Sequence, residues 1–223
     1  MNIVINNNTF WSRKEVIIIS SLFIIYSIII FIISFLIESS IELEFSQIFL
    51  IIHIGISFFI FIIFSFFRKK NLSYLSFNFS LKWFLISVLL IFVIVVFDVF
   101  VLEIMDNFLN NETVDQSNVL LSDNFWLNIL NFYIFGSILI PFIEELIFKG
   151  LIFKYIRQSR EFVFSALISS LMFAMIHLDI QFMIFQFLFS IVTVFVFEKT
   201  DSIFYPFLIH VGVNVIFFST LYV

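Results

Sequence analysis

The chain has no cysteine, and its 223 residues include only two prolines and four glycines. Without cysteine there is no disulfide, no thiolate metal ligand and no cysteine nucleophile. Scarce glycine and proline exclude collagen-like and loop-rich folds. Charge is scarce as well, because charged residues make up 12% of the sequence, about half of the ~25% usual in a soluble domain. A soluble globular protein is therefore excluded.

The few charges are mostly acidic, with 11 Lys+Arg against 16 Asp+Glu and a net charge of −5. A protein that binds nucleic acid needs an excess of basic side chains for the phosphates, so we expect no nucleic-acid partner. Hydrophobic residues make up 62% of the chain, which excludes an intrinsically disordered protein. The composition indicates a polytopic membrane protein.

Seven apolar runs are long enough to cross a bilayer as helices, since a crossing needs roughly 20 residues. They cover residues 16–37, 48–67, 83–102, 125–143 (continuing toward 155), 162–178, 180–197 and 203–222. We predict an all-α bundle of about seven transmembrane helices in the cell membrane, surrounded by lipid. The first run is too long for the core of a signal peptide, so we expect it to stay in the membrane.

The basic residues predict the orientation of this bundle. Loops 38–47 and 103–124 contain no Lys or Arg, whereas every basic residue falls on the other side of the predicted spans, at positions Arg13, Lys14, Arg68, Lys69, Lys70, Lys82, Lys149, Lys154, Arg157, Arg160 and Lys199. Cytoplasmic loops of membrane proteins are enriched in Lys and Arg. We therefore expect a cytoplasmic N-terminus and an outward C-terminus.

Several polar residues in or near the spans have ordinary structural explanations. His53 stands alone in the second run, where we expect a neutral imidazole bonded to a backbone carbonyl. Asp98 and Glu103 lie near the outer end of the third run and are expected at the interface or paired across helices. Asp179 falls in a tight turn, where a short side chain bonds the backbone.

A pair of glutamates within the fourth run is harder to explain in this way, because ionisable residues within a span are costly and mark functional candidates. Glu144 and Glu145 point about 100° apart on a helix. Glu145 reaches Lys149 at the favourable i, i+4 spacing, which leaves Glu144 without a partner on its own helix and makes it the candidate general base. The alternative is that both glutamates lie at a helix end in the headgroup region.

Two further motifs lie in later runs. Phe173 precedes His177 by one helical turn, and His210 precedes Asn214 by the same spacing, so each pair shares one helix face. Gly212, between His210 and Asn214, allows another backbone or a substrate to approach closely. At ~1.5 Å of rise per residue, the depths of Glu144, these two histidines and Asn214 are compatible with one cluster in the membrane.

These three motifs, in this order and in separate late spans, resemble the CPBP family of intramembrane proteases. This family is also called Abi or the CAAX-protease and bacteriocin-processing family, and it includes the type II CAAX prenyl endopeptidases. The resemblance covers about residues 125–220 and implies two regions, with three spans in 1–124 and a four-span catalytic core in 125–223. One position departs from the family pattern, because Lys149 stands where the family usually has arginine; a lysine can keep the charge pairing but lacks the bidentate fork.

The resemblance also implies a role for each residue. Glu144 would activate a water with help from His177, and His210 and Asn214 would donate hydrogen bonds to the oxyanion of the scissile carbonyl. The supporting residues would be Glu145 and Lys149, which brace the site, and Phe173, which packs against His177. We assign no metal ligand and favour chemistry without a metal, although two glutamates and two histidines could also supply the nitrogen and oxygen ligands of a zinc ion.

The function that follows is an intramembrane endopeptidase whose site opens toward the cytoplasm. Its partners would be a peptide or membrane-protein substrate and the lipid bilayer, in the processing of a peptide signal or bacteriocin precursor, or in self-immunity. Two alternatives stay open. A family member with little or no activity could act as an immunity factor or as a membrane scaffold for a partner protein, and Lys149 favours that reading. A small transporter would explain the spans but not the clustered motifs.

Overall fold

The computed structural model describes residues 12–40, 79–109, 124–177 and 180–220, and every regular element within these ranges is helical. The elements are α1 (Arg13–Ser40), α3 (Leu81–Leu109), α5 (Phe125–Asn128), η2 (Ile129–Leu139), α6 (Ile140–Glu145), η3 (Leu146–Phe153), α7 (Lys154–Arg157), α8 (Phe162–Met175), α9 (Ile180–Thr200) and α10 (Phe204–Thr220). The predicted all-α class is confirmed. The run 48–67, with His53, and the residues Arg68, Lys69, Lys70 and Asp179 lie outside the described residues.

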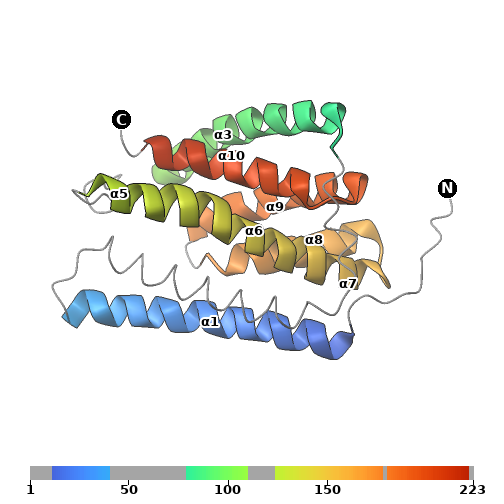
Figure 1. The fold of residues 1–223 in the computed structure, drawn as a ribbon, viewed down its shortest axis with the longest axis horizontal. Helices are drawn as coiled ribbons and strands as arrows, with labels where there is room; N and C mark the ends of the chain where they lie inside the picture. Colours follow the sequence, from blue (N-terminus) through green and yellow to red (C-terminus); the bar gives the residue numbers. More distant parts are fainter. Residues whose placement is uncertain (1–11, 41–78, 110–123, 178–179, 221–223) are drawn as a thin grey trace.

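The helices lie side by side along the long axis of the molecule (Figure 1). α10 packs between α3 and η2, α8 packs against α9 and η3, and α1 contacts η3 at the edge of the bundle. The largest core cluster includes Phe148, Phe173 and Ile209, together with Phe23 from α1 and Ile94 from α3. The helices of both predicted regions therefore contribute to one core, while the proposed boundary near residue 125 stays a prediction.

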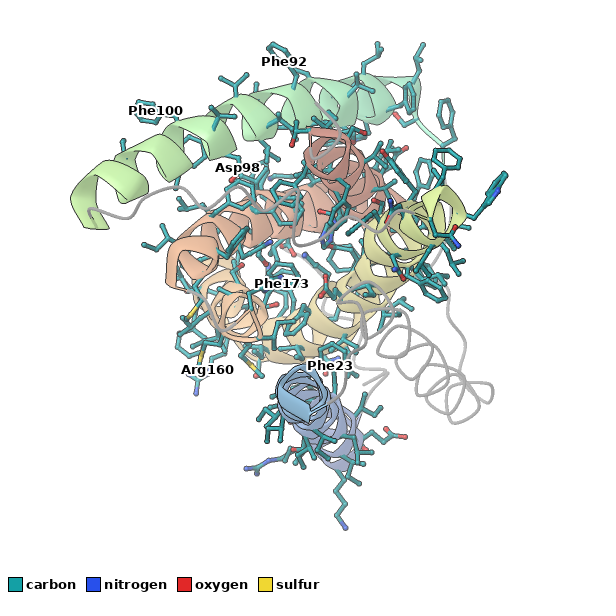
Figure 2. All side chains as sticks on the ribbon, turned by 90° about the vertical axis from the view of Figure 1, so that its left-hand side faces the viewer. Phe23, Phe92, Asp98, Phe100, Arg160 and Phe173 are labelled. Atoms are coloured by element: carbon teal, nitrogen blue, oxygen red, sulfur yellow. The ribbon has the colours of Figure 1, made fainter. Side chains whose placement is uncertain are left out.

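The outer surface of the bundle is apolar, as a bilayer requires. Among the residues that the structure describes, three helices are long and apolar enough to cross a membrane, over Leu81–Val101, Phe125–Arg157 and Phe182–Thr200, and two shorter apolar helices cover Phe162–Met175 and Phe204–Thr220. Figure 2 shows Phe92 and Phe100 of α3 pointing away from the bundle, where each is more than half exposed. Such large apolar side chains are stable there only against lipid or another apolar surface. The chain is therefore a helical membrane bundle.

The described basic residues gather at one end of the bundle, except for Lys149, which the sequence places with them and which the structure buries at the centre. Arg157 at the end of α7 donates to Glu198 of α9 from two nitrogens, each 3.0 Å from the same carboxylate oxygen. Lys154 forms an ion pair of 2.7 Å with Asp201, just beyond α9. The first turns of α1 and α3 lie at this same end (Figure 1), as the distribution of Lys and Arg predicts. The number of crossings and the side of the membrane on which this end lies stay predictions.

The helix that carries the two glutamates is continuous from Phe125 to Arg157, but it is not regular. Two π-helical segments, η2 and η3, flank the short α-helical segment α6. Pro141 lies in the first turn of α6 and has no N–H to donate. The sequence predicts a plain helix here, and the structure shows a wider winding on both sides of the glutamates. Such π-helical turns occur often at functional sites.

Candidate active site

The centre of the bundle holds a buried ionic cluster of three residues. Lys149 Nζ donates to Glu145 Oε1 at 2.8 Å, and His210 Nδ1 lies 3.0 Å from the same oxygen. Glu145 and Lys149 are fully buried and His210 is 3% exposed. Because a carboxylate oxygen only accepts, Nδ1 of His210 carries the hydrogen in this contact. The i, i+4 pair predicted from the sequence is therefore present, and His210 joins it from α10.

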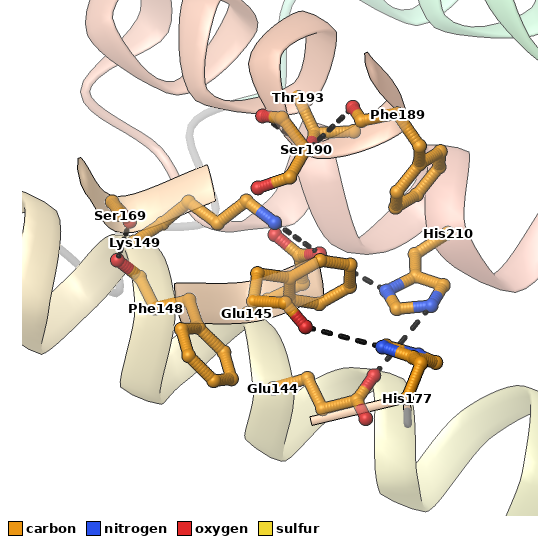
Figure 3. A network of polar contacts seen from close by, with 11 residues as sticks. Glu144, Glu145, Phe148, Lys149, Ser169, His177, Phe189, Ser190, Thr193 and His210 are labelled. Carbon is orange, nitrogen blue, oxygen red and sulfur yellow. Dashed lines mark hydrogen bonds and ion pairs between the residues drawn. The ribbon is translucent and has the colours of Figure 1, made fainter. Parts of the chain in front are cut away.

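Glu144 faces the other nitrogen of the same imidazole. Its Oε2 lies 3.7 Å from His210 Nε2, longer than a good hydrogen bond, and the residue is 8% exposed. Adjacent glutamates thus have different surroundings, as their directions on a helix predict. Glu145 is held by a lysine and an imidazole, whereas Glu144 reaches the cavity described below. In Figure 3, Glu144, His177 and His210 face one another.

His177 lies just beyond α8, and a backbone carbonyl orients its ring. His177 Nδ1 is 3.1 Å from the carbonyl oxygen of Phe173. The carbonyl can only accept, so Nδ1 carries the hydrogen and Nε2 of a neutral ring is left as an acceptor. The ring centroids of Phe173 and His177 are 5.2 Å apart, which is the contact that the spacing predicts. His177 is therefore positioned to hold a water or a substrate N–H.

Aromatic rings surround the ionic cluster and exclude solvent from it. Phe173 is fully buried, and its ring centroid lies 4.5 Å from Lys149 Nζ. Phe189 packs edge-on against His210 with ring centroids 4.8 Å apart. An ammonium over a ring face gains electrostatic stabilisation, which increases when water is absent. Lys149, at the position where the resemblance leads one to expect arginine, thus makes both an ion pair and a cation–π contact.

Asn214 is oriented by the irregular helix on the opposite side of the site. Its Nδ2 donates to the carbonyl oxygen of Gly136 at 3.0 Å. The N–H of Ile140 donates to the carbonyl oxygen of Phe135. Pro141 is five residues after Gly136, where a π-helical turn would supply the N–H, but proline has none. The carbonyl of Gly136 therefore lacks a donor from these helical positions, and Asn214 supplies one. The second N–H of the Asn214 amide is left for another acceptor.

A cavity of about 280 Å³ joins these side chains. Its polar lining residues are Asp98, Glu144, His177, Gln186, His210 and Asn214, and its apolar lining includes Phe182, Phe185 and Phe217. All four residues predicted as catalytic therefore line one cavity, while Glu145, Lys149 and Phe173 lie behind its wall. This space is at the lower end of the range of ligand pockets. It is large enough for a short segment of a peptide and a water.

Two polar lining residues, Asp98 and Gln186, were not predicted as part of the site. Asp98 lies in α3. Its place in the sequence predicts a position at the interface or a pair across helices, whereas the structure places it in the cavity wall. Gln186 lies in α9 among apolar residues. A carboxylate within a span was the available signal for Asp98, and a lone amide among phenylalanines was a weaker one for Gln186.

The geometry also bears on the zinc alternative. Within the described parts of the chain, no three residues of the His, Asp or Glu type are placed to hold a metal ion. Glu145 Oε1 already accepts from Lys149 and lies at hydrogen-bonding distance from His210. The described residues therefore offer no three-residue ligand set for zinc in this arrangement, and Glu145 would have to give up its contacts with Lys149 and His210 to serve as a ligand. The choice between chemistry with and without a metal stays a prediction.

Comparison with known proteins agrees with the geometry. Residues 126–216 match the sequence profile of the family described as type II CAAX prenyl endopeptidase Rce1-like. A protein of Bacillus subtilis (strain 168) named "Putative membrane peptidase YdiL" is 31% identical over 81 residues. That match covers 36% of this chain and 33% of the relative, so the aligned part spans about a third of the relative's length.

No solved structure matches the chain significantly. The matched residues 126–216 include the glutamate pair, Lys149, both histidines of the cavity and Asn214. α1 and α3 lie outside the matched range, although Asp98 of α3 lines the same cavity. Residues 126–216 are therefore similar to the type II CAAX prenyl endopeptidase Rce1-like family, and a shorter stretch of the chain is similar to the named membrane peptidase.

Proposed function

We propose that the chain is an intramembrane endopeptidase that hydrolyses a peptide bond in a membrane-associated peptide or protein segment. The observation that carries this proposal is the single cavity lined by Glu144, His177, His210 and Asn214. It combines a carboxylate for proton abstraction with donors on a separate helix for the charge that develops on the carbonyl oxygen. The match to a family of CAAX-type endopeptidases supports the same reaction class.

The reaction begins with a water held between Glu144 and His177. Glu144 takes one proton from the water, and the oxygen of that water forms a bond to the scissile carbonyl carbon. The negative charge moves to the carbonyl oxygen, which accepts from the free N–H of Asn214 and from Nε2 of His210. His210 donates from Nε2 only when it carries both protons, since Nδ1 already donates to Glu145.

Collapse of the tetrahedral intermediate completes the reaction. The C–N bond breaks, and the departing amine receives the proton that Glu144 holds, so the products are a carboxylic acid and an amine. Glu145 and Lys149 do not take part in these transfers. They hold the ring of His210 in position, and the Phe173 carbonyl does the same for His177. Preorganised donors of this kind cost no reorganisation in the transition state.

The test compares peptides in membranes and culture medium from cells that produce the wild type, Glu144→Gln or Glu198→Gln. Glu144→Gln keeps the shape of the side chain and removes the base, so we expect cleavage to fall roughly 10²- to 10⁴-fold. Glu198→Gln is the matched control, because Glu198 pairs with Arg157 away from the cavity. Quantitative mass spectrometry of the cleaved species measures both effects.

The same experiment distinguishes the scaffold alternative. If the chain is a scaffold or immunity factor without activity, it should tolerate Glu144→Gln. A deletion strain that produces this variant at normal levels should then have the same peptides and the same phenotype as one that produces the wild type. That outcome would reject the peptidase. The retained contact of Lys149 with Glu145 favours the active reading, since the substitution for arginine leaves the pair intact. We further propose that the substrates are precursors of peptide signals or bacteriocin-like precursors and that they enter from the cytoplasmic side.

A further inference from the structure

Two polar side chains of the cavity have no part in the reaction proposed above. Asp98 comes from α3, and Gln186 comes from α9 on another wall of the same cavity. Figure 2 shows Asp98 on the inner side of α3, whereas Phe92 and Phe100 point outward from the same helix. A carboxylate within an apolar span is costly unless it meets water or a partner. The inward position of Asp98 therefore calls for an explanation.

Within the described part of the chain, the cavity wall offers Asp98 no lysine or arginine. Among the described residues that line the cavity, two are acidic, Asp98 and Glu144, and none is Lys or Arg. The nearby ammonium of Lys149 is bound to Glu145 behind the wall. A substrate group that enters this space thus meets negative charge in surroundings of low dielectric, where charge interactions are strong.

Gln186 adds to the same cavity a second hydrogen-bond acceptor that lacks a donor. Its Oε1 is buried and has no hydrogen-bond partner within the described residues. A buried carbonyl oxygen without a donor loses its hydration and gains nothing in return. Asp98 is an acceptor when ionised, so both groups call for a ligand that brings N–H donors, and Asp98 calls for one that brings positive charge as well.

We propose that Asp98 and Gln186 form a specificity subsite for a cationic group of the peptide substrate, either a Lys or Arg side chain or a free α-amino group. The inference rests on the proposed function and deepens it by naming the substrate class. At ~30 Å³ per water, the cavity corresponds to about nine waters. A short extended stretch of peptide fits this space, with its cationic group at Asp98 and its scissile bond at Glu144.

The test measures binding and cleavage separately on the purified full chain in detergent. Three short apolar peptides are identical except at one position, which carries Lys, norleucine or Glu. We expect the Lys peptide to bind the wild type about tenfold or more tightly than the norleucine peptide, because a charged hydrogen bond replaces water in an apolar site. Fluorescence anisotropy of labelled peptides reports the affinities.

Variants of Asp98 assign the preference to this residue. Asp98→Asn should remove the advantage of the Lys peptide, and Asp98→Lys should transfer it to the Glu peptide. Asp201→Asn is the matched control, because Asp201 pairs with Lys154 at the basic end of the bundle and should leave the preference unchanged. The subsite is rejected if the three peptides bind the wild type equally or not at all, or if Asp98→Asn keeps the preference.

Cleavage of the same peptides, followed by mass spectrometry, tests the proposed function independently. Cleavage that Glu144→Gln abolishes, without any preference for Lys, would support the peptidase and reject the subsite. Binding that is selective for Lys and depends on Asp98, without cleavage of any peptide, would support the subsite and reject the peptidase. A preference for Lys in both binding and cleavage supports both.

Discussion

Two ion pairs in this bundle have similar distances but very different surroundings. The pair of Glu145 and Lys149, at 2.8 Å, is fully buried at the centre, whereas Arg157 and Glu198, at 3.0 Å, are each about one quarter exposed at the basic end. The central pair contacts His210 and two aromatic rings and supports the candidate active site. The outer pair joins the end of α7 to the end of α9.

The difference shows that distance alone does not measure what an ion pair contributes. An exposed pair exchanges water for a partner at little net gain. A buried pair has already lost its hydration, so removal of one member leaves the other charged and without solvent. The central pair thus makes the structure sensitive to single substitutions even where the pair itself adds little net stability. Three substitutions test this contrast, from the largest expected effect to the smallest.

Lys149→Ala should have the largest effect on stability. It leaves Glu145 buried without its ammonium partner and opens space beside Phe173, so we expect a loss of about 3–5 kcal/mol. Unfolding of the purified protein by denaturant in detergent measures the change. Lys154→Ala is the matched control at the bundle end and should cost far less. Equal losses for the two variants would contradict the assigned difference between the two environments.

Lys149→Arg should have an intermediate effect. The fully buried position must accept a larger guanidinium between Phe173 and Glu145, and overpacking of this kind costs about 1–3 kcal/mol. The positive charge next to Glu145 is retained, so peptide cleavage should persist. The same unfolding measurement, with a parallel cleavage assay, checks both statements. A gain in stability would instead mean that the site is shaped for arginine and that lysine underfills it.

Arg157→Ala should have the smallest effect. The pair with Glu198 is partly solvated at the bundle end, so its loss should cost less than about 1 kcal/mol and should weaken further as salt is raised. Cleavage should be unchanged, because neither residue lines the cavity. Unfolding at low and high salt measures the effect. A loss as large as that of Lys149→Ala would show that the central and the outer ion pair contribute alike.

Much of the fold follows from composition and run lengths. Apolar runs of about 20 residues predict helices, because every backbone group must pair within its own segment in lipid. The pair of Glu145 and Lys149 was predictable for a related reason, since it depends only on the regular spacing within one helix. The contact of Phe173 with His177 belongs to the same class.

Contacts between helices were not predictable in this way. The bond from Asn214 to Gly136 depends on a π-helical segment and on Pro141 five positions later, and no periodicity in the sequence indicates that winding. The direction of Asp98 depends on how α3 rotates against α10. Spacing along one helix is set by its geometry, whereas the rotation of one helix against another depends on the packing of many side chains.

The arrangement around Glu145 has a consequence for the way the bundle is assembled. Lys149 and Glu145 enter the membrane together on one helix, but their imidazole partner comes from α10, which follows much later in the chain. Until α10 docks, the carboxylate lacks one of its two partners, and the apolar cover from Phe189 over His210 does not exist. Chains that fail to dock α10 therefore expose an ionic group inside the bilayer. The residues that position the candidate active site thus also link its completion to the correct insertion of the last described helix.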